Sequence, residues 1–259
     1  MLRAICPVKF PMLLPIPQEI ALAVLMFLGA ALYSSVGHAG SSAYQAAMAL
    51  FGVPAQVMRP TALSLNVIVS TLGTIRYSRS GLTDWPMLVP LLIGSVPAAF
   101  IAGGIKLPPE VFRPLLGAVL LFTAFRLLWP GSFRFNAVAR SPRHWLALLA
   151  GVVIGALAGL TGTGGGIFLS PLLLFLGWSE TRRASGTAAA FILFNSLAGL
   201  AGNYLAVRQL PPDLWLFALA VLAGGIIGTT LGISRLATEW LLKALGLVLI
   251  IAAAKLILG

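Results

Sequence analysis

Two short glycine-rich segments interrupt long apolar stretches of this sequence, and both contain small polar side chains. The first segment covers residues 37–42 (GHAGSS) and the second covers residues 162–166 (GTGGG). Backbone that leaves the helical conformation inside a membrane is stable only where protein or a polar cavity satisfies its N–H and C=O groups. A short helix after each segment would present free N–H groups and the positive end of its dipole. The two segments therefore predict a binding site for a small anion.

The candidate binding residues are the glycines, hydroxyls and amides in and near the two segments. Asn66 and the pair Asn195–Ser196 interrupt apolar stretches, where they either join helices or line the site. His38 lies inside the first segment, where a titratable group can couple proton movement to transport. Glycines in apolar helices also serve close packing alone, and this alternative stays open. The complete set is Gly37, His38, Gly40, Ser41, Ser42, Gln45, Thr61, Asn66, Thr163, Gly164, Gly165, Gly166, Ser170, Thr187, Asn195 and Ser196.

The composition shows which solvent must cover this chain. Hydrophobic residues make up 59% of the 259 residues and charged residues only 9%, and the mean hydropathy is +1.00. A soluble domain carries about 25% charged residues, so lipid must cover this one. All six acidic residues lie at the ends of apolar runs, since a charge at mid-bilayer costs roughly 3 kcal/mol. The net charge of +11 then indicates basic loops that orient helices beside anionic lipid, not a nucleic-acid partner.

The lengths of the apolar stretches predict an all-α, polytopic membrane protein. A helix needs about 20 apolar residues to cross a hydrocarbon layer about 30 Å thick. The uncharged run over 144–178 would be about 52 Å long as one helix, so it must break, and the second glycine segment is where it would do so. The other expected spans are residues 20–36, 60–75, 85–105, 111–128, 184–207, 214–234 and 240–258.

Matching residues in the two halves predict an internal duplication. The matches, in order, are Gly37, Gly40, Gly52, Thr61, Gly73, Asp84, Glu110 and Arg126 with Gly162, Gly165, Gly177, Thr187, Gly199, Asp213, Glu239 and Lys255. We predict an N-terminal tail over 1–19, a first repeat over 20–129, a basic loop over 130–143 and a second repeat over 144–259. Each repeat would hold a glycine-broken helix or re-entrant hairpin followed by three transmembrane helices. A hairpin would make the repeats inverted, whereas a bent helix would make them parallel.

Longer motifs around the two segments resemble those of one transporter family. In the second half these are residues 164–172 (GGGIFLSPL), 177–178 (GW), 184–187 (ASGT) and 194–199 (FNSLAG), and in the first half 36–40 (VGHAG) and 59–64 (RPTALS). In combination they resemble the sulfite exporter TauE/SafE family, also called the toluenesulfonate uptake permease family, from about residue 18 to the end. The resemblance implies a multi-pass inner-membrane carrier for sulfite, sulfonates or other sulfur-containing organic anions. The first segment has fewer glycines than the family motif, which leaves the ligand open.

The residues and the resemblance together predict a secondary transporter that moves a small, sulfur-containing anion across the inner membrane. The sequence carries no ATP-binding, metal or cofactor motif, so a gradient or a partner protein would drive it. An anion channel and a non-transporting membrane assembly protein are the alternatives. An enzyme is not expected, because the sequence contains no arrangement of residues typical of a catalytic site. Arg59 and Arg182, at the starts of matched spans, are expected to guide anions inward, and the sequence leaves open whether the chain forms a homo-oligomer.

Overall fold

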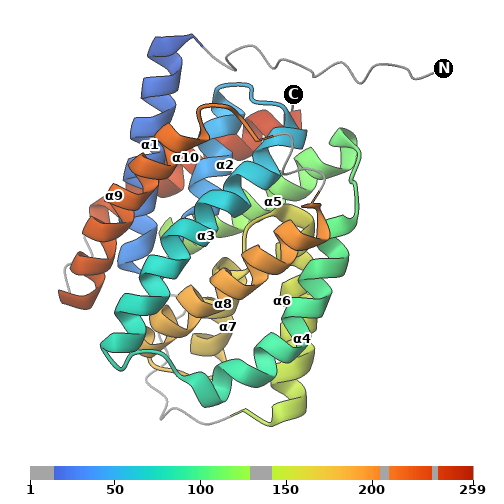
Figure 1. Ribbon diagram of the computed structural model, residues 1–259, viewed down its shortest axis with the longest axis vertical. Helices are drawn as coiled ribbons and strands as arrows, with labels where there is room; N and C mark the ends of the chain where they lie inside the picture. Colours follow the sequence, from blue (N-terminus) through green and yellow to red (C-terminus); the bar gives the residue numbers. More distant parts are fainter. Residues whose placement is uncertain (1–14, 129–141, 205–209, 235–238, 259) are drawn as a thin grey trace.

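The computed structural model describes residues 15–128, 142–204, 210–234 and 239–258 (Figure 1). Within these ranges the chain forms ten α-helices and no β-strand, which confirms the all-α prediction. The helices are α1 (Ile16–Ser35), α2 (Ser41–Leu50), α3 (Ala55–Arg79), α4 (Trp85–Gly104), α5 (Pro109–Leu128), α6 (His144–Thr161), α7 (Gly166–Phe175), α8 (Thr181–Gly202), α9 (Leu214–Ser234) and α10 (Glu239–Leu258).

Each predicted apolar stretch corresponds to one long helix. By length and composition, α1, α4, α6, α8 and α9 can each cross a membrane, so the chain is a multi-pass membrane protein. Helix α1 begins at Ile16, four residues before the predicted start, because Pro17 lies in the first turn, where its missing N–H costs nothing. Most of the predicted tail over 1–19 and of the predicted basic loop over 130–143 lies outside the described residues.

Both predicted helix breaks occur at the glycine segments. Helix α1 ends before the first segment and α2 starts within it, while α6 and α7 flank the second segment in the same way. Helices α2 and α7 both have ten residues, which is half the length of a membrane span. The residue before each of them is a glycine in the left-handed conformation, Gly40 with φ 101° and Gly165 with φ 81°. Only glycine adopts this conformation without a steric cost, which explains why the chain breaks at these positions.

The first break is a hairpin, because α2 folds back along α1. Near the break, the Ser42 hydroxyl donates to the Tyr33 hydroxyl at 2.7 Å. Further along, a Cβ added at Gly29 would lie 2.7 Å from the Cβ of Ala43. Later residues of α2 thus meet earlier residues of α1, so the two helices run antiparallel (Figure 1). A single bent helix over this region, one of the two alternatives from the sequence, is ruled out.

Two pairs of parallel helices, each with one member from each half of the chain, interlock through glycines spaced four residues apart. A Cβ added at Gly155 of α6 would lie 2.3 Å from the Ser95 oxygen on α4. At Gly228 of α9, an added Cβ would lie 2.1 Å from the Ala31 oxygen on α1. Such close approach of two backbones is how membrane helices gain packing energy without a hydrophobic driving force. The glycines of the two seams are Gly151, Gly155 and Gly159 on α6, and Gly224, Gly228 and Gly232 on α9.

Buried apolar side chains form two clusters, and neither cluster corresponds to one half of the sequence. We call them the first core, built from α1, α2, α3, α5, α9 and α10, and the second core, built from α4, α6, α7 and α8. Ile192 of α8 is the one residue of these four helices that packs in the first core. The glycine seams join helices within a core: α1 with α9 in the first, and α4 with α6 in the second. Each core therefore combines both halves of the chain. We call the helices of each core a body, and the two bodies pack against each other through α3 and α8.

The glycine seam between α4 and α6 predicts a stability difference between two matched substitutions. Gly155→Ala forces the two backbones apart, whereas a Cβ at Gly73 of α3 makes only ordinary contact, at 3.4 Å from Ala189. Both substitutions gain the same helix propensity, so the overpacking of about 1–3 kcal/mol at Gly155 determines the difference. We expect Gly155→Ala to unfold about 5 °C below Gly73→Ala in a thermal melt of the purified protein in detergent. Equal melting temperatures would contradict the seam.

Candidate functional site

The two glycine segments, far apart in the sequence, meet inside the protein. The Ser41 hydroxyl, at the start of α2, donates to the Thr163 carbonyl at 2.7 Å. One turn further along α2, the Gln45 amide donates to the Thr161 carbonyl at 3.1 Å. These carbonyls belong to the end of α6 and the loop before α7, where no regular helix bond is available to them. Side chains of the first break thus satisfy the backbone of the second.

Long helices α3 and α8 add amide and hydroxyl groups to the place where the breaks meet. The Asn66 side-chain nitrogen lies 3.5 Å from both the Thr163 carbonyl and the Ser196 hydroxyl, which brings together the polar positions of the two helices. Asn195 faces the interior as well, and its amide donates to the Phe191 carbonyl at 2.8 Å. We call the assembly the central polar cluster; its residues are His38, Ser41, Gln45, Asn66, Thr161, Thr163, Gly166, Ser170 and Ser196.

The central polar cluster has hydrogen-bonding capacity that the described residues do not use. Among them, no partner exists for the side-chain oxygens of Gln45 and Asn66, nor for that of the adjacent Asn195. All three side chains are 1% exposed or less. A buried polar atom without a partner costs about 1–3 kcal/mol, so such atoms mark places where a ligand or water binds. An amide can also turn to present its NH₂ group, which makes these side chains adaptable donors.

Two helix N-termini give the central polar cluster a positive potential. Ser41 is the first residue of α2 and Gly166 the first of α7, and neither helix has a side-chain cap. Each N-terminus acts as roughly half a positive charge, and that effect is strongest where water is excluded. Ser41 and Thr163 are both buried, and no residue of the cluster is a carboxylate. The electrostatics of the cluster therefore favour an anion over a cation.

The predicted site glycines differ in how they relate to the central polar cluster. A Cβ at Gly164 would lie 2.8 Å from the Asn66 nitrogen and 2.9 Å from the Ser196 hydroxyl, so Gly164 borders the cluster directly. Gly165 instead packs beneath Phe191, and Gly40 lies against the ring of Tyr44. A Cβ at Gly37 would lie 2.2 Å from the Ser185 carbonyl, so Gly37 allows contact between the first break and α8.

Three of the predicted hydroxyl-bearing residues lie outside the central polar cluster. Ser42 bonds within the α1–α2 hairpin. Thr61 lines a separate small cavity near Glu19 and Asp213, and the Thr187 hydroxyl accepts from the Asp84 backbone N–H at 3.1 Å, beside the start of α4. For Thr61, the separation follows from its position along α3. Thr61 lies five residues before Asn66, about 7.5 Å along α3, so it lies at a different depth from the cluster.

No feature of the sequence indicates the role that Arg59 has in the structure. We expected it to lie accessible and guide anions, but its side chain is 6% exposed and donates to carbonyls at the end of α4. Its partners there are Ala102 and Ile105, each at 3.0 Å, together with Gly103. A helix end inside protein needs donors for its last carbonyls, and Arg59 provides them from α3. Arg59 lies beside Gly162, so it packs against the second break. It does not lie on the surface, where it could attract anions.

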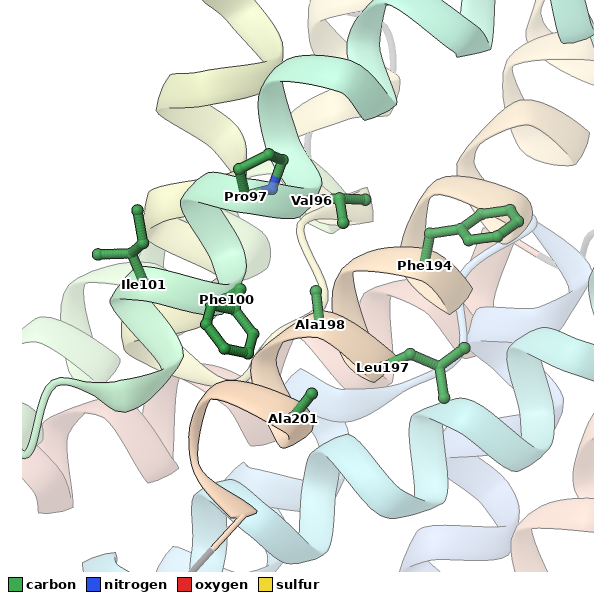
Figure 2. Close-up of a pocket in the computed structure, with 8 residues that line it drawn as sticks. All are labelled: Val96, Pro97, Phe100, Ile101, Phe194, Leu197, Ala198 and Ala201. Carbon is green, nitrogen blue, oxygen red and sulfur yellow. The ribbon is translucent and has the colours of Figure 1, made fainter.

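A larger hollow lies on the outside of the protein, between α4 and α8 (Figure 2). It has a volume of about 530 Å³, and its lining is apolar throughout. Phe100 and Ile101 at its edge are half or more exposed. On a membrane-spanning surface such a groove faces hydrocarbon and offers nothing to a polar ligand. The groove residues are Val96, Pro97, Phe100, Ile101, Phe194, Leu197, Ala198 and Ala201.

Long apolar helices around a buried polar cluster define a polytopic membrane protein with a polar interior. The chain belongs to the sulfite exporter TauE/SafE family, whose model matches residues 21–256. It is 37% identical to the probable membrane transporter protein y4hK of Sinorhizobium fredii over 93% of this chain and 98% of that protein. It is 26% identical to the probable membrane transporter protein YjnA of Bacillus subtilis, over 80% and 85%. No solved structure matches it. Its family places the chain among membrane transporters, not among enzymes.

The position of Gly164 predicts that a side chain added there slows transport. Gly164→Ala and Gly52→Ala carry the same backbone strain, because φ is +71° and +73°, but a Cβ at Gly52 meets nothing within 4 Å. We expect Gly164→Ala to lower the flux of radiolabelled sulfite or methanesulfonate, whichever the unmodified protein carries, by about tenfold or more, the equivalent of one lost hydrogen bond to charge. Gly52→Ala should retain most of the flux in the same proteoliposome assay. Equal flux in both variants would place the site elsewhere.

Proposed function

We propose that this protein is a secondary transporter that carries a small anion across the inner membrane and takes sulfur-containing oxyanions such as sulfite or a sulfonate. The observation that carries the proposal is the convergence of two helix N-termini on one buried polar cluster without a carboxylate. Backbone N–H groups at a helix start bind oxyanions without a fixed positive side chain. Hydroxyls from Ser41, Ser170 and Ser196 add donors around the same point. The family's description, sulfite exporter, supports sulfur oxyanions as the substrate class.

The contacts at the cluster favour a carrier over an anion channel. Direct bonds join the two breaks, including Ser41 to Thr163 and Gln45 to Thr161, so the centre is closed by protein. A carrier has such an occluded state in its cycle, whereas an open channel needs a continuous wet path. The breaks also belong to different bodies, since α1, α2 and α3 pack in the first core and α6, α7 and α8 in the second. Rocking of one body against the other would expose the cluster to each side in turn.

We infer further that the two halves are inverted repeats. Six glycines at matched positions all have positive φ: Gly37, Gly40 and Gly52 with Gly162, Gly165 and Gly177. Matched helices also run antiparallel where they touch. Gly73 of α3 meets Ala189 of α8, while the earlier Leu63 meets the later Gly199. Helices α5 and α10 are antiparallel as well, because Gly117 meets Ile257 and Gly246 meets Leu128. Inverted repeats with broken helices are a common plan of secondary transporters.

Inverted repeats predict that the inter-repeat junction and the C-terminus lie on opposite sides of the membrane. We would place single cysteines at Arg143 and at Leu258 in a Cys6→Ser background and label intact cells with a membrane-impermeant maleimide. Arg143 is exposed beside a basic loop and should be cytoplasmic, hence protected until the cells are lysed. The cysteine introduced at Leu258 should react with the maleimide added outside intact cells. Labelling of both from the same side would rule out inversion.

The proposed substrate class predicts selective stabilisation by anions. We would screen the purified protein by thermal shift against the sodium salts of sulfite, methanesulfonate, sulfoacetate, thiosulfate and acetate. A ligand at 100 times its Kd stabilises the bound state by about 2.7 kcal/mol, so a true substrate raises the melting temperature measurably. Gly164→Ala should lose the shift. Counterflow of the same anion in proteoliposomes distinguishes a carrier, which shows it, from a channel. A melting temperature that none of these anions raises would overturn the proposal.

A further inference from the structure

His38 holds its imidazole ring between two backbone carbonyls, one from each break. Its Nδ1 lies 3.0 Å from the Val36 oxygen, and its Nε2 lies 2.9 Å from the Gly166 oxygen. The Ser170 hydroxyl is also close to Nε2, at 3.2 Å. The ring is 3% exposed, so water does not replace these contacts. His38 thus connects the first break to the first turn of α7.

Carbonyl oxygens only accept hydrogen bonds, and this restricts the protonation state of the ring. A neutral imidazole has one N–H, so in either tautomer the other nitrogen would face a carbonyl with its lone pair. In the Nδ1–H tautomer, Nε2 can accept from the Ser170 hydroxyl at 3.2 Å, but the Gly166 carbonyl is nearer, at 2.9 Å. Only the imidazolium form donates from both nitrogens. We propose that His38 is doubly protonated in this closed state and is the proton-binding site of the transporter, so that one proton accompanies each anion.

The coupling follows from the charges that surround the ring. A buried imidazolium is costly when unpaired, and the positive ends of α2 and α7 raise that cost. An anion in the central polar cluster offsets both. Anion binding and protonation of His38 therefore stabilise each other, and the effect is reciprocal by thermodynamic necessity. This inference rests on the proposed function, and it names the coupling ion of the same site.

The proton has a defined place in the transport cycle. The proton binds to one ring nitrogen of His38 when the anion binds to the cluster. His38 then bridges the two bodies through Gly166 and Ser170. When the bodies separate on the opposite side, the ring loses its Nε2 partners. The anion and the proton leave to water, and the neutral ring no longer joins the breaks. No electron transfer or covalent change is involved.

Tyrosines face this region from the neighbouring helices. The ring of Tyr33 on α1 lies 6.2 Å from that of His38, centroid to centroid, and Tyr77 of α3 lines the same small cavity as His38. Tyr44 of α2 donates to the Ala39 carbonyl. Tyrosine is neutral at physiological pH, so these groups do not change charge there. Among the arginines of the adjoining helices α3 and α8, Arg76 and Arg182 donate to groups on α9, and Arg59 donates to carbonyls at the end of α4.

The chain has two histidines, which makes a direct test of the ring state possible. We would incorporate ¹⁵N-labelled histidine and record ring nitrogen shifts in the presence of methanesulfonate, an anion that does not titrate in this range. His144 is exposed and serves as the internal control, with His144→Gln used for assignment. At pH 7.5, His38 should show two protonated ring nitrogens. A neutral tautomer at His38 under these conditions would overturn the inference.

Binding of methanesulfonate at different pH values provides the second measurement. If one proton binds with each anion, affinity rises by up to about tenfold for each unit by which the pH falls. The unmodified protein and His144→Gln should show this dependence, and His38→Gln should lose it. Retention of the full dependence in His38→Gln would contradict the role of His38. Absence of anion binding at any pH would instead reject the proposed function, and the ring state would still be measured. Should His38→Gln fail to fold, the nitrogen shifts decide alone.

Discussion

Unwound backbone inside a membrane must find hydrogen-bond partners in the protein, and this constraint governs the centre of the structure. Lipid offers no donors or acceptors, so each glycine break depends on groups from elsewhere. Here the first break satisfies the second: Ser41, Gln45 and His38 bond carbonyls of Thr163, Thr161 and Gly166. The contacts that complete the fold are therefore the same contacts that form the site. A ligand that enters the cluster must replace some of them.

The packing around the centre divides the protein so that such an exchange is possible. Glycine seams fix α1 to α9 and α4 to α6, and two separate apolar cores hold the remaining helices. The central polar cluster lies on the boundary between the cores, beside the apolar contacts of α3 with α8. Interhelical hydrogen bonds in membranes contribute only about 0.6 kcal/mol each on average, whereas close packing adds up over a whole helix. The polar contacts of the cluster are thus the part of this boundary that a ligand can exchange for its own hydrogen bonds.

Charged side chains form hydrogen bonds with unpaired backbone groups at several helix ends. Arg59 satisfies the last carbonyls of α4, and Arg182 donates to the Ile233 carbonyl at 2.7 Å near the end of α9. Asp84 caps the start of α4 by accepting from the Met87 N–H at 3.1 Å. These fixed charges compensate helix dipoles away from the centre. The starts of α2 and α7 are left without side-chain caps, so their positive potential stays available to a solute.

The sequence by itself determined the elements of this protein, and the tertiary structure determined their partners. Apolar run length and glycine spacing located the long helices and both breaks, because these depend on local conformation and on the thickness of a membrane. The sequence also indicated that Asn66 and Ser196 face each other, since buried polar groups need partners. It could not exclude Thr61 and Thr187, whose distance from the cluster depends on where α3 and α8 cross. Nor could it place Arg59 at the end of α4 or His38 between two carbonyls, because those contacts join residues far apart in the chain and only packing brings them together.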